Sequence, residues 1–522
     1  MENKSYIIFI CAIVSLGGFL FGFDAAVISG CNSFITSHFD LTSLQLGVVV
    51  SSVTISSALA MLVAGTIADA IGRKPVLIVV AFFYLISAIG SALAPSYTAI
   101  ILARLLGGVA FGAALVLVPL YIAELVPAKM RGSMVSVQQL AIVLGFSAAY
   151  FSNYYLLNLS KSGSELALEY NLIENIWRWM LGVEVIPALL FFTALFFIPR
   201  SPRWLVMKGR VKEALNNITK AHGGERADAV IQDIEQNLLA SAGEEKTSVF
   251  DSIKNMFKSR YSKIMLVAFT IGIAQMSVGI NAVFFYITNI FELTGIGTDA
   301  SFVQSVWVGL INVGFTLVAI FLIDRVGRRP LLLTGIAGVL ISLLVIAYGF
   351  SKADYVLTSA EVTALDINFD KALLTPMIGK TYNNDAIFVK ALKETIGLEK
   401  TRDNKGALIK AAGNLNPVLL LFGILGFVAC FAFSLGPVMW VLLSEIFPTA
   451  IRGIAISVVG FTNSLTSWVV VQFFPWQLDN FGSATTFMIY AVFAAVALAI
   501  LFKILPETKG KTLEELEKQL AV

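Results

Sequence analysis

Three ionisable residues, Asp24, Arg104 and Glu184, lie inside long apolar runs of the sequence. A charged side chain is costly in such surroundings, so it usually faces the interior of a helix bundle and pairs with another charge. Loss of water disfavours the charged form of a carboxylate, whereas a nearby guanidinium favours it. An Asp24–Arg104 pair whose exposure changes could therefore take up and release a proton. The alternative is a static ion pair that only fixes helix packing, although a buried pair is weak evidence for stability alone.

A second group of polar residues in apolar surroundings is neutral and consists of Gln139, Gln275, Asn281, Asn312 and Asn463. A carboxamide offers two donors and a carbonyl acceptor, which suits the vicinal hydroxyls of a sugar. Because neutral amides need no counter-charge, they suit an uncharged polyol better than an anion. Trp440 adds a flat apolar face and an N–H donor. The alternative for any single amide is a hydrogen bond that holds two helices together.

Other chemistries find no support in the sequence. The two histidines, His38 and His222, and the three cysteines, Cys11, Cys31 and Cys430, show no spacing typical of a metal site or a disulfide framework. The sequence also lacks a nucleophile–base motif and the phosphate-binding loop of an ATP-driven pump. The net charge of only +3 argues against a nucleic-acid binder. We therefore predict that the protein is not an enzyme and has neither a cofactor nor a metal.

Helices that cross a membrane must position these residues. Of the 522 residues, 57% are hydrophobic and only 14% are charged, with a mean hydropathy of +0.82, whereas soluble domains carry roughly 25% charged residues. A span needs about 20 mostly apolar residues. We predict an all-α membrane protein with about twelve spans, near 6–30, 46–68, 76–95, 98–122, 132–156, 178–198, 264–291, 301–323, 331–350, 415–443, 454–475 and 483–505.

The distribution of basic residues in the short loops predicts the orientation. One side contributes only Lys161. The other side holds Arg73, Lys74, Lys129, Arg131, Arg325, Arg328, Arg329 and Arg452. Basic short loops are cytoplasmic as a rule. We therefore expect a multi-pass protein of the plasma membrane with both termini in the cytoplasm, which would be the inner membrane of a Gram-negative bacterium.

Repeated motifs divide the chain into two halves. Gly72-Arg73-Lys74-Pro75 matches residues 327–330, and the segment 124–132, which begins with Glu124, matches 445–453. The second pair is farther apart than the first by about the length of the hydrophilic stretch 351–414, so that stretch is an insertion on the outer side. The domains are then six spans in 1–198, a cytoplasmic helical linker in 199–263, six spans in 264–505 and a tail in 506–522. Such repeats place the substrate near the midplane between them.

The chain resembles the sugar porters of the major facilitator superfamily, and among them most resembles the bacterial D-xylose:proton symporters. The segments that carry the resemblance are 21–30 (FGFDAAVISG), 69–74 (DAIGRK), 121–127 (YIAELVP), 275–281 (QMSVGIN), 324–329 (DRVGRR), 436–440 (GPVMW) and 506–510 (PETKG). The resemblance implies two six-helix bundles in the major facilitator fold, acting on a monosaccharide by alternating access. We expect the protein to function as a monomer in the lipid bilayer.

The resemblance also implies roles for individual residues. Asp24 and Arg104 match the pair that couples protons to sugar transport, and Glu184 matches an assisting glutamate. Because uniporters of the family have asparagine at the aspartate position, Asp24 favours symport. The implied sugar contacts are Gln139, Gln275, Asn281, Trp440, Asn312, Asn463, Phe21, Phe431 and Gly436. The alternatives are a facilitative uniporter and a sugar sensor that does not transport.

Several positions depart from the family pattern. Met276 and Phe146 replace glutamines, and Phe285 replaces a tyrosine. Each change removes a polar group, and one lost hydrogen bond costs about 0.5–1.5 kcal/mol. The affinity or the preferred sugar is therefore expected to differ, with D-xylose as the first candidate. Arg200 stands where the family has a glutamate.

Charged residues expected at the cytoplasmic helix ends form a third group. The resemblance implies that they bridge the two halves as a charge lock when the outer side is open. The alternative is charge that only sets topology, on solvated helix ends. The expected members are Asp69, Arg73, Glu124 and Arg131 in the first half, with Asp324, Arg328, Glu445 and Arg452 in the second.

Overall fold

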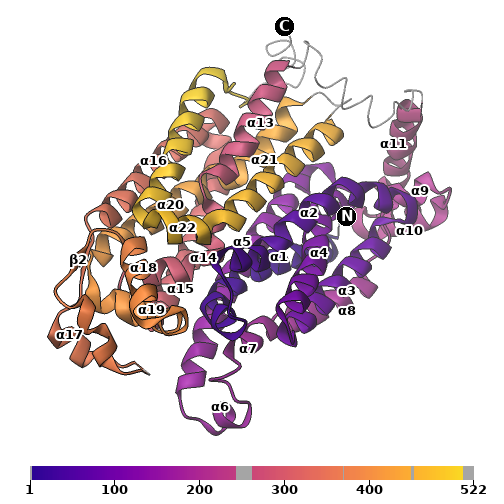
Figure 1. Ribbon diagram of the computed structural model, residues 1–522. Coiled ribbons are helices and arrows are strands. Elements are labelled where there is room, and N and C mark those ends of the chain that lie inside the picture. The colour runs from indigo at the N-terminus through magenta and orange to yellow at the C-terminus, as the bar shows by residue number, and fades with distance from the viewer. Residues whose placement is uncertain (1–2, 243–261, 368, 448–451, 510–522) are drawn as a thin grey trace.

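The computed structural model describes residues 3–242, 262–367, 369–447 and 452–509. Figure 1 shows two groups of helices side by side, one indigo to magenta and the other rose to yellow. The first half contains α1 (Lys4–His38), α2 (Ser43–Ile71), α3 (Arg73–Ala92), α4 (Tyr97–Leu125), α5 (Ala128–Lys161), α6 (Glu165–Glu169), α7 (Ile176–Gly182), α8 (Val185–Ala194) and the 3-10 turn η1 (Leu195–Phe197). The second half contains α13 (Ser262–Ser277), α14 (Ile280–Leu293), α15 (Thr298–Val326), α16 (Arg328–Ser351), α20 (Pro417–Phe433), α21 (Leu435–Ile446) and α22 (Arg452–Ile504).

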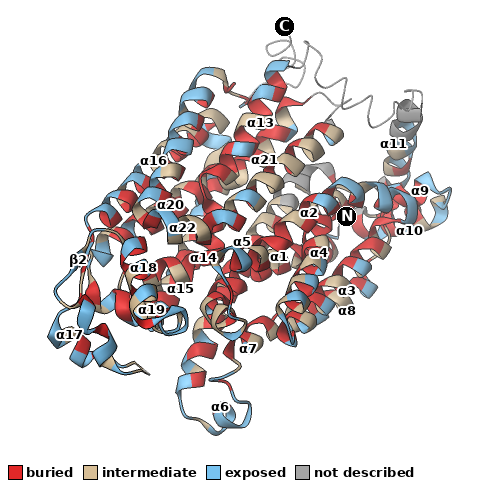
Figure 2. Cartoon of the chain, in the orientation of Figure 1, coloured by how far each residue is buried: buried red, intermediate tan, exposed pale blue. Residues whose placement is uncertain are grey.

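The described residues include 11 helical stretches that are long and apolar enough to cross a membrane. The last, Gly453–Ile504, has 52 residues and contains Gly482 in a non-helical conformation (φ 79°, ψ 167°). About 20 residues suffice for one span, so this stretch supplies two, and the predicted twelve-span fold is confirmed. Large apolar side chains such as Phe197 and Ile186 are exposed on the periphery. Figure 2 shows buried residues concentrated between the helices and exposed ones outside.

Three spans are broken near their middle. α7 and α8 separate at Glu184, α13 and α14 at Gly279, and α20 and α21 at Ser434. Gly279 has φ 88°, and a Cβ there would lie 2.8 Å from a ring carbon of Tyr490. Glycine is therefore required at this position both for the backbone angle and for the close approach. At each break the backbone N–H bonds the carbonyl three residues earlier, as from Glu184 to Leu181 and from Ser434 to Phe431.

The two halves meet at one end of the bundle. There α1 contacts α14, α2 contacts α22, and α5 contacts α15. The Asn32 amide donates to the carbonyl oxygen of Phe285 (2.8 Å), and the Ser51 hydroxyl donates to the side-chain oxygen of Gln472 (2.7 Å). A Cβ on Gly47 would lie 2.1 Å from the Gln472 carbonyl oxygen. The backbones of α2 and α22 are therefore packed closely at this end.

The linker folds against the first half. Its described helices are α9 (Pro202–Met207), α10 (Val211–His222) and α11 (Gly224–Ala242), and they share a small core that includes Leu205 and Ile218. The Tyr121 hydroxyl donates to the carbonyl oxygen of Pro199 (2.7 Å), which ties the start of the linker to α4. The remainder of the expected linker, from 243 to 261, lies outside the described residues. We call this end of the bundle the linker side.

The stretch 351–414 folds as a small unit at the opposite end, which we call the insertion side (Figure 1). It comprises β1 (Asp354–Val356), α17 (Ser359–Ala364), the 3-10 helix η3 (Lys371–Met377), β2 (Thr381–Tyr382), α18 (Asp385–Ile396), α19 (Leu398–Ala412) and β3 (Gly413–Asn414). The strands form an antiparallel sheet in the order β2-β1-β3. The ring of Tyr355 on β1 stacks on Phe388 of α18, with centroids 5.5 Å apart.

Asp385 joins this unit to the second half. Its carboxylate accepts hydrogen bonds from the Ser483 backbone N–H (3.0 and 3.1 Å) and from the Ser483 hydroxyl (2.5 Å). Burial raises the pKa of Asp385, against the lowering effect of these hydrogen bonds. The contact therefore places an acceptor beside two buried donors at the turn of α22.

We expect Asp385→Ala to destabilise the attachment of residues 351–414 by about 1–3 kcal/mol, because the buried donors of Ser483 lose their acceptor. Thermal unfolding of the purified protein in detergent and limited proteolysis of the insertion measure the loss. Lys390→Ala, an exposed substitution in the same helix, is the control. Unchanged protease resistance in Asp385→Ala would show that this contact does not hold the insertion in place.

Candidate functional site

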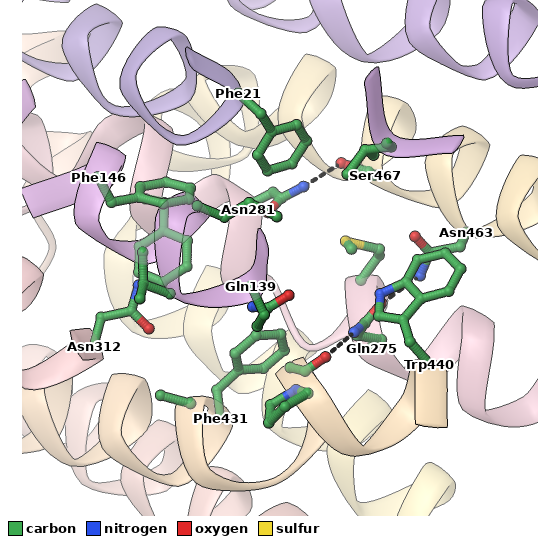
Figure 3. A pocket seen from close by; sticks show the side chains of 18 of the residues that line it. Phe21, Gln139, Phe146, Gln275, Asn281, Asn312, Phe431, Trp440, Asn463 and Ser467 are labelled. Atoms are coloured by element: carbon green, nitrogen blue, oxygen red, sulfur yellow. Dashed lines mark hydrogen bonds between the residues drawn. The ribbon is translucent and has the colours of Figure 1, made fainter. Parts of the chain in front are cut away.

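A central cavity of about 140 Å³ lies between the two halves. All nine residues expected to contact sugar line it (Figure 3). Phe21 comes from α1 and Gln139 from α5, whereas the other seven belong to the second half. Their contact with a sugar stays a prediction, but the fold brings them to one place from eight helices. The members are Phe21, Gln139, Gln275, Asn281, Asn312, Phe431, Gly436, Trp440 and Asn463.

Hydrogen bonds hold three of the amides in place. The Asn463 amide nitrogen donates to the Gln275 side-chain oxygen (2.8 Å) and to the Gly272 carbonyl oxygen (2.8 Å). The Gln275 nitrogen donates to the carbonyl oxygen of Leu435 (2.9 Å), at the break between α20 and α21. The Asn281 nitrogen donates to the Ser467 hydroxyl (2.7 Å). Because these nitrogens are engaged, the carbonyl oxygens of Asn281 and Asn463 are the groups that can accept from hydroxyls of a ligand.

Aromatic rings form much of the remaining wall. Phe21 stacks on Phe111 with centroids 3.6 Å apart, and Phe146 lies 4.7 Å from Phe284 by the same measure. All four line the cavity together with Trp440. Flat apolar faces beside fixed amides suit a ligand that has C–H faces and hydroxyl edges.

The three departures from the family pattern do not share one location. Phe146 and Met276 line the cavity. Phe285 does not line it: this side chain is buried in the core of the protein, and the neighbouring Phe284 occupies the wall. On a helix, adjacent residues point about 100° apart, and on α14 this rotation directs Phe284 to the cavity and Phe285 to the core. The expected loss of a polar group from the sugar site therefore applies to 146 and 276 and not to 285.

Sequence reasoning missed several hydroxyl groups of the wall, namely Thr54, Ser57, Thr316, Ser464 and Ser467. Serine and threonine are common between membrane helices, so their presence carried no signal by itself. The spacing did carry one for Thr316 and Ser467, because each lies four residues after a selected amide, at 312 and 463, on the same helix face.

Asp24 of α1 and Arg104 of α4 form a buried ion pair in the first half. The carboxylate and guanidinium approach to 3.1 Å, and their side chains are 5% and 1% exposed. The Arg104 Nε also donates to the carbonyl oxygen of Val49 (3.1 Å). Asp24 Oδ2 and Arg104 Nη2 are buried without a hydrogen-bond partner among the described residues. The pair is therefore only partly satisfied, which leaves an acceptor site on Asp24 that a proton could occupy.

Glu184 and Tyr84 lie in the same buried region of the first half. Glu184 sits at the break between α7 and α8, is 4% exposed, and interacts electrostatically with both Asp24 and Arg104. The Tyr84 hydroxyl is buried without a partner in the described part of the chain and interacts with Asp24 and Glu184. The sequence analysis did not select Tyr84, because one tyrosine in an apolar helix is usually packing.

The charged residues of the linker side pair within each half. Arg73 contacts Asp69 (2.7 Å) and Glu124 (2.8 Å). Arg328 contacts Asp324 and Glu445 in the same pattern, at 3.1 and 2.7 Å. These four contacts join helices of one half to each other. The side chains of Arg131 and Arg452 lie outside the described residues, so the bridging charge lock stays a prediction.

The two halves differ at one linker-side position, where the second half has Glu507 and the first half has Arg200. In the second half, Glu507 accepts from the backbone N–H groups of Arg328 (3.1 Å) and Arg329 (3.1 Å) at the start of α16. Burial opposes ionisation of Glu507, but the backbone hydrogen bonds outweigh it and lower the pKa. In the first half the Trp204 ring lies against Gly72 instead, and its indole donates to the Asp69 carbonyl oxygen (3.1 Å). An aromatic contact thus replaces the carboxylate.

Comparison with known proteins identifies the family to which this architecture belongs. The family described as "Sugar (and other) transporter" matches residues 10–365 and 403–520. The chain is 32% identical over 517 residues to an arabinose-proton symporter of Bacillus subtilis, covering 99% of this chain and 96% of that protein. A glucose transport protein of Synechocystis is 33% identical, with 98% and 97% covered. A D-xylose-proton symporter of Escherichia coli is 30% identical, with 99% and 96% covered.

A solved structure agrees with this comparison. It is the partially occluded inward-open conformation of the xylose transporter XylE from E. coli, which superposes with a TM-score of 0.73 at 29% identity. The superposition covers 98% of this chain and 100% of the other. The arrangement of helices described above is therefore similar to that of this solved structure.

Removal of Arg104 should show that the buried pair depends on both members. Arg104→Met leaves the Asp24 carboxylate buried without its cation, which typically costs about 3–5 kcal/mol. Adding Asp24→Asn removes the charge and should recover most of that loss. Thermal unfolding of the single and double variants in detergent measures both effects. A double variant no more stable than Arg104→Met would contradict the electrostatic explanation.

Proposed function

This chain belongs to the sugar transporter family of the major facilitator superfamily, and on that premise we propose that it imports a monosaccharide together with a proton. It is a multi-pass membrane transporter and not an enzyme. One observation carries the proposal: the helix that contributes Phe21 to the amide-lined and aromatic-lined cavity also carries Asp24, a member of a buried, partly satisfied carboxylate–guanidinium pair. Such a cavity has the neutral hydrogen-bonding groups that a sugar needs, and such a pair has a site for a proton.

Sugar binding is the task of the second half. Gln275, Asn281 and Asn463 are fixed by hydrogen bonds before a ligand arrives, so little ordering is needed on binding. Gln139 and Phe21 approach from the first half. A sugar held between them links the halves, which allows occupancy to bias their relative movement.

Proton coupling is the task of the first half. Protonation of Asp24 removes its charge and with it the attraction that holds Arg104, so Arg104 can turn toward other acceptors. Glu184 is a second buried carboxylate that interacts electrostatically with both Asp24 and Arg104. Because Asp24 and Phe21 share α1, a change at the pair is transmitted directly to the cavity wall.

The proposed orientation puts the linker side in the cytoplasm and the insertion side outside. The basic loops support it, since Arg73, Arg328 and Arg329 all lie on the linker side. We also propose that the protein acts as a monomer in the plasma membrane. In this orientation the ion pairs of Arg73 and Arg328 lie at the cytoplasmic helix ends, where the predicted lock would form. The sugar enters from the insertion side and leaves on the linker side.

D-xylose is the first candidate sugar, and the relatives widen the choice. The similar proteins are named for arabinose, glucose and D-xylose, so the panel to test spans pentoses and hexoses. The apolar side chains of Phe146 and Met276 remove polar groups from the wall, and this favours a sugar with fewer hydroxyls facing that part. A facilitative uniporter with the same cavity is the second candidate, since a static Asp24–Arg104 pair would give it the same geometry.

Sugar-induced proton uptake tests the proposal. In a lightly buffered suspension of de-energised cells, addition of the transported sugar should raise the external pH, and Asp24→Asn should abolish the rise. Glu213→Gln, which alters a carboxylate on the linker surface, is the control and should retain it. Entry of labelled sugar with no pH change would assign a uniporter, and no entry of any sugar on the panel would overturn transport.

The amide network predicts a graded loss of affinity. Gln275→Ala removes the oxygen that fixes the Asn463 amide at the cavity wall and should raise KM for sugar uptake by about 3- to 10-fold, which corresponds to one net hydrogen bond of about 0.5–1.5 kcal/mol. Ser444→Ala on the neighbouring α21, an exposed hydroxyl that bonds its own helix, should leave KM unchanged. Initial rates of labelled-sugar uptake measure both, and an unaltered KM in Gln275→Ala would remove this residue from the site.

A further inference from the structure

Residues 351–414 form a folded unit that the sugar transporter family does not share in full. The family match stops at 365 and resumes at 403, so the segment between, which includes η3, β2 and α18, lies outside that match. The unit lies at the ends of the second-half helices on the insertion side (Figure 1), and α19 also contacts α1 of the first half. Its function therefore has to be argued from its own contacts, and the argument rests on the proposed function only for the direction of transport.

The unit is fastened to the second half. Asp385 accepts from Ser483 of α22, as described above, and the Asn384 amide donates to the Phe481 carbonyl oxygen (3.3 Å). Lys393 of α18 pairs with Asp479 at 3.3 Å. These contacts lie around the turn between the last two spans, so the unit moves with the second half.

Two contacts cross from the unit to the first half. Arg402 of α19 pairs with Asp40 at 2.7 Å, and the Ser37 hydroxyl at the end of α1 donates to Asp403 (2.8 Å). Arg402 is well fixed for a surface residue, because its side chain is 14% exposed and it also contacts Asp403 at 3.2 Å. Asp40 has φ 53°, a left-handed conformation that aspartate adopts more readily than most residues. The turn between α1 and α2 is thus presented to α19.

Residues of α18 and α19 line one side of a second cavity, of about 400 Å³, on the insertion side of the contact between the halves. The first half contributes Ser33 and Thr42 to its wall, the second half contributes Asn289 and Glu292, and α19 contributes Thr401. The contact below closes the path to the central cavity, through hydrogen bonds such as that from Asn32 to Phe285. A sugar from outside must therefore pass the region that α19 spans.

We propose that residues 351–414 are an outer latch, which holds the outer entrance closed by joining the second half to Ser37 and Asp40 of the first. When the halves part on the outside, the Arg402–Asp40 and Ser37–Asp403 contacts must break, because their two sides belong to different halves. Exposed ion pairs are weak, so the latch shifts the balance between outer-closed and outer-open states without fixing either.

Cross-linking tests whether the two crossing contacts must break. Ser37→Cys with Asp403→Cys joins the latch to the first half, and Lys393→Cys with Asp479→Cys joins it to the second. Each pair is bridged with a short bifunctional thiol reagent and compared with its own unbridged form. Bridging should lower the rate of labelled-sugar uptake more than 10-fold in the first pair and change it by less than 2-fold in the second. Full transport by the bridged first pair would overturn the latch, as would arrest by both pairs.

Accessibility gives a measure that needs no transport. Ser29 is buried between α1 and α14, where its hydroxyl contacts Thr288, so Ser29→Cys should react with an impermeant thiol reagent added outside only when the entrance opens. Adding Arg402→Ala should raise the labelling rate about 2- to 5-fold, as expected for loss of one surface ion pair. The matched control, Lys390→Ala, should not change it.

The two measurements separate the latch from the proposed function. Faster labelling in Arg402→Ala without any sugar uptake would support the latch and refute sugar transport. An unchanged labelling rate together with normal uptake would refute the latch and leave transport intact. The parent chain without Ser29→Cys corrects for Cys31 and the other native thiols, of which Cys11 and Cys31 are buried.

Discussion

A polar group inside the hydrocarbon layer has no water to bond to, and this cost governs how the protein is built. The Asp24–Arg104 pair shows the cost most directly, because both side chains are almost fully buried and removal of either partner would leave an uncompensated buried charge. The same cost explains why Gln275 and Asn463 bond to each other and to free backbone carbonyls at a helix break. Polar groups that remain without partners are then the ones available to a proton or a sugar.

The two halves divide the chemistry between them. Ionisable groups gather in the first half, where α1, α4 and the α7–α8 break meet, whereas the amides gather in the second half around α13, α14 and α22. Neither half holds a complete site. The proposed coupling between proton and sugar would therefore depend on the relative position of the halves, with Phe21 and Asp24 on one helix as its link. The latch would act on that same relative position from outside.

The duplicated ends of the bundle show how far the two halves have diverged. Arg73 and Arg328 make matching pairs with Glu124 and Glu445, so the repeat is retained where opposite charges meet. At the neighbouring position Glu507 caps the backbone of α16, whereas Trp204 packs against Gly72 in the first half. The aromatic contact packs the linker against the first half but provides no carboxylate to accept the backbone N–H groups at the start of α3.

The sequence by itself determined the twelve spans, the repeat and the residue types of the site. Apolar length and charge spacing are local properties, so the membrane spans follow from them. Isolated amides in apolar runs, together with the family resemblance, were enough to select nine of the residues that line the cavity. Only the tertiary structure decided that Phe285 faces away, that Tyr84 joins the buried carboxylates, and that residues 351–414 span both halves. Those outcomes depend on helix rotation and on contacts between residues hundreds of positions apart, which no local pattern records.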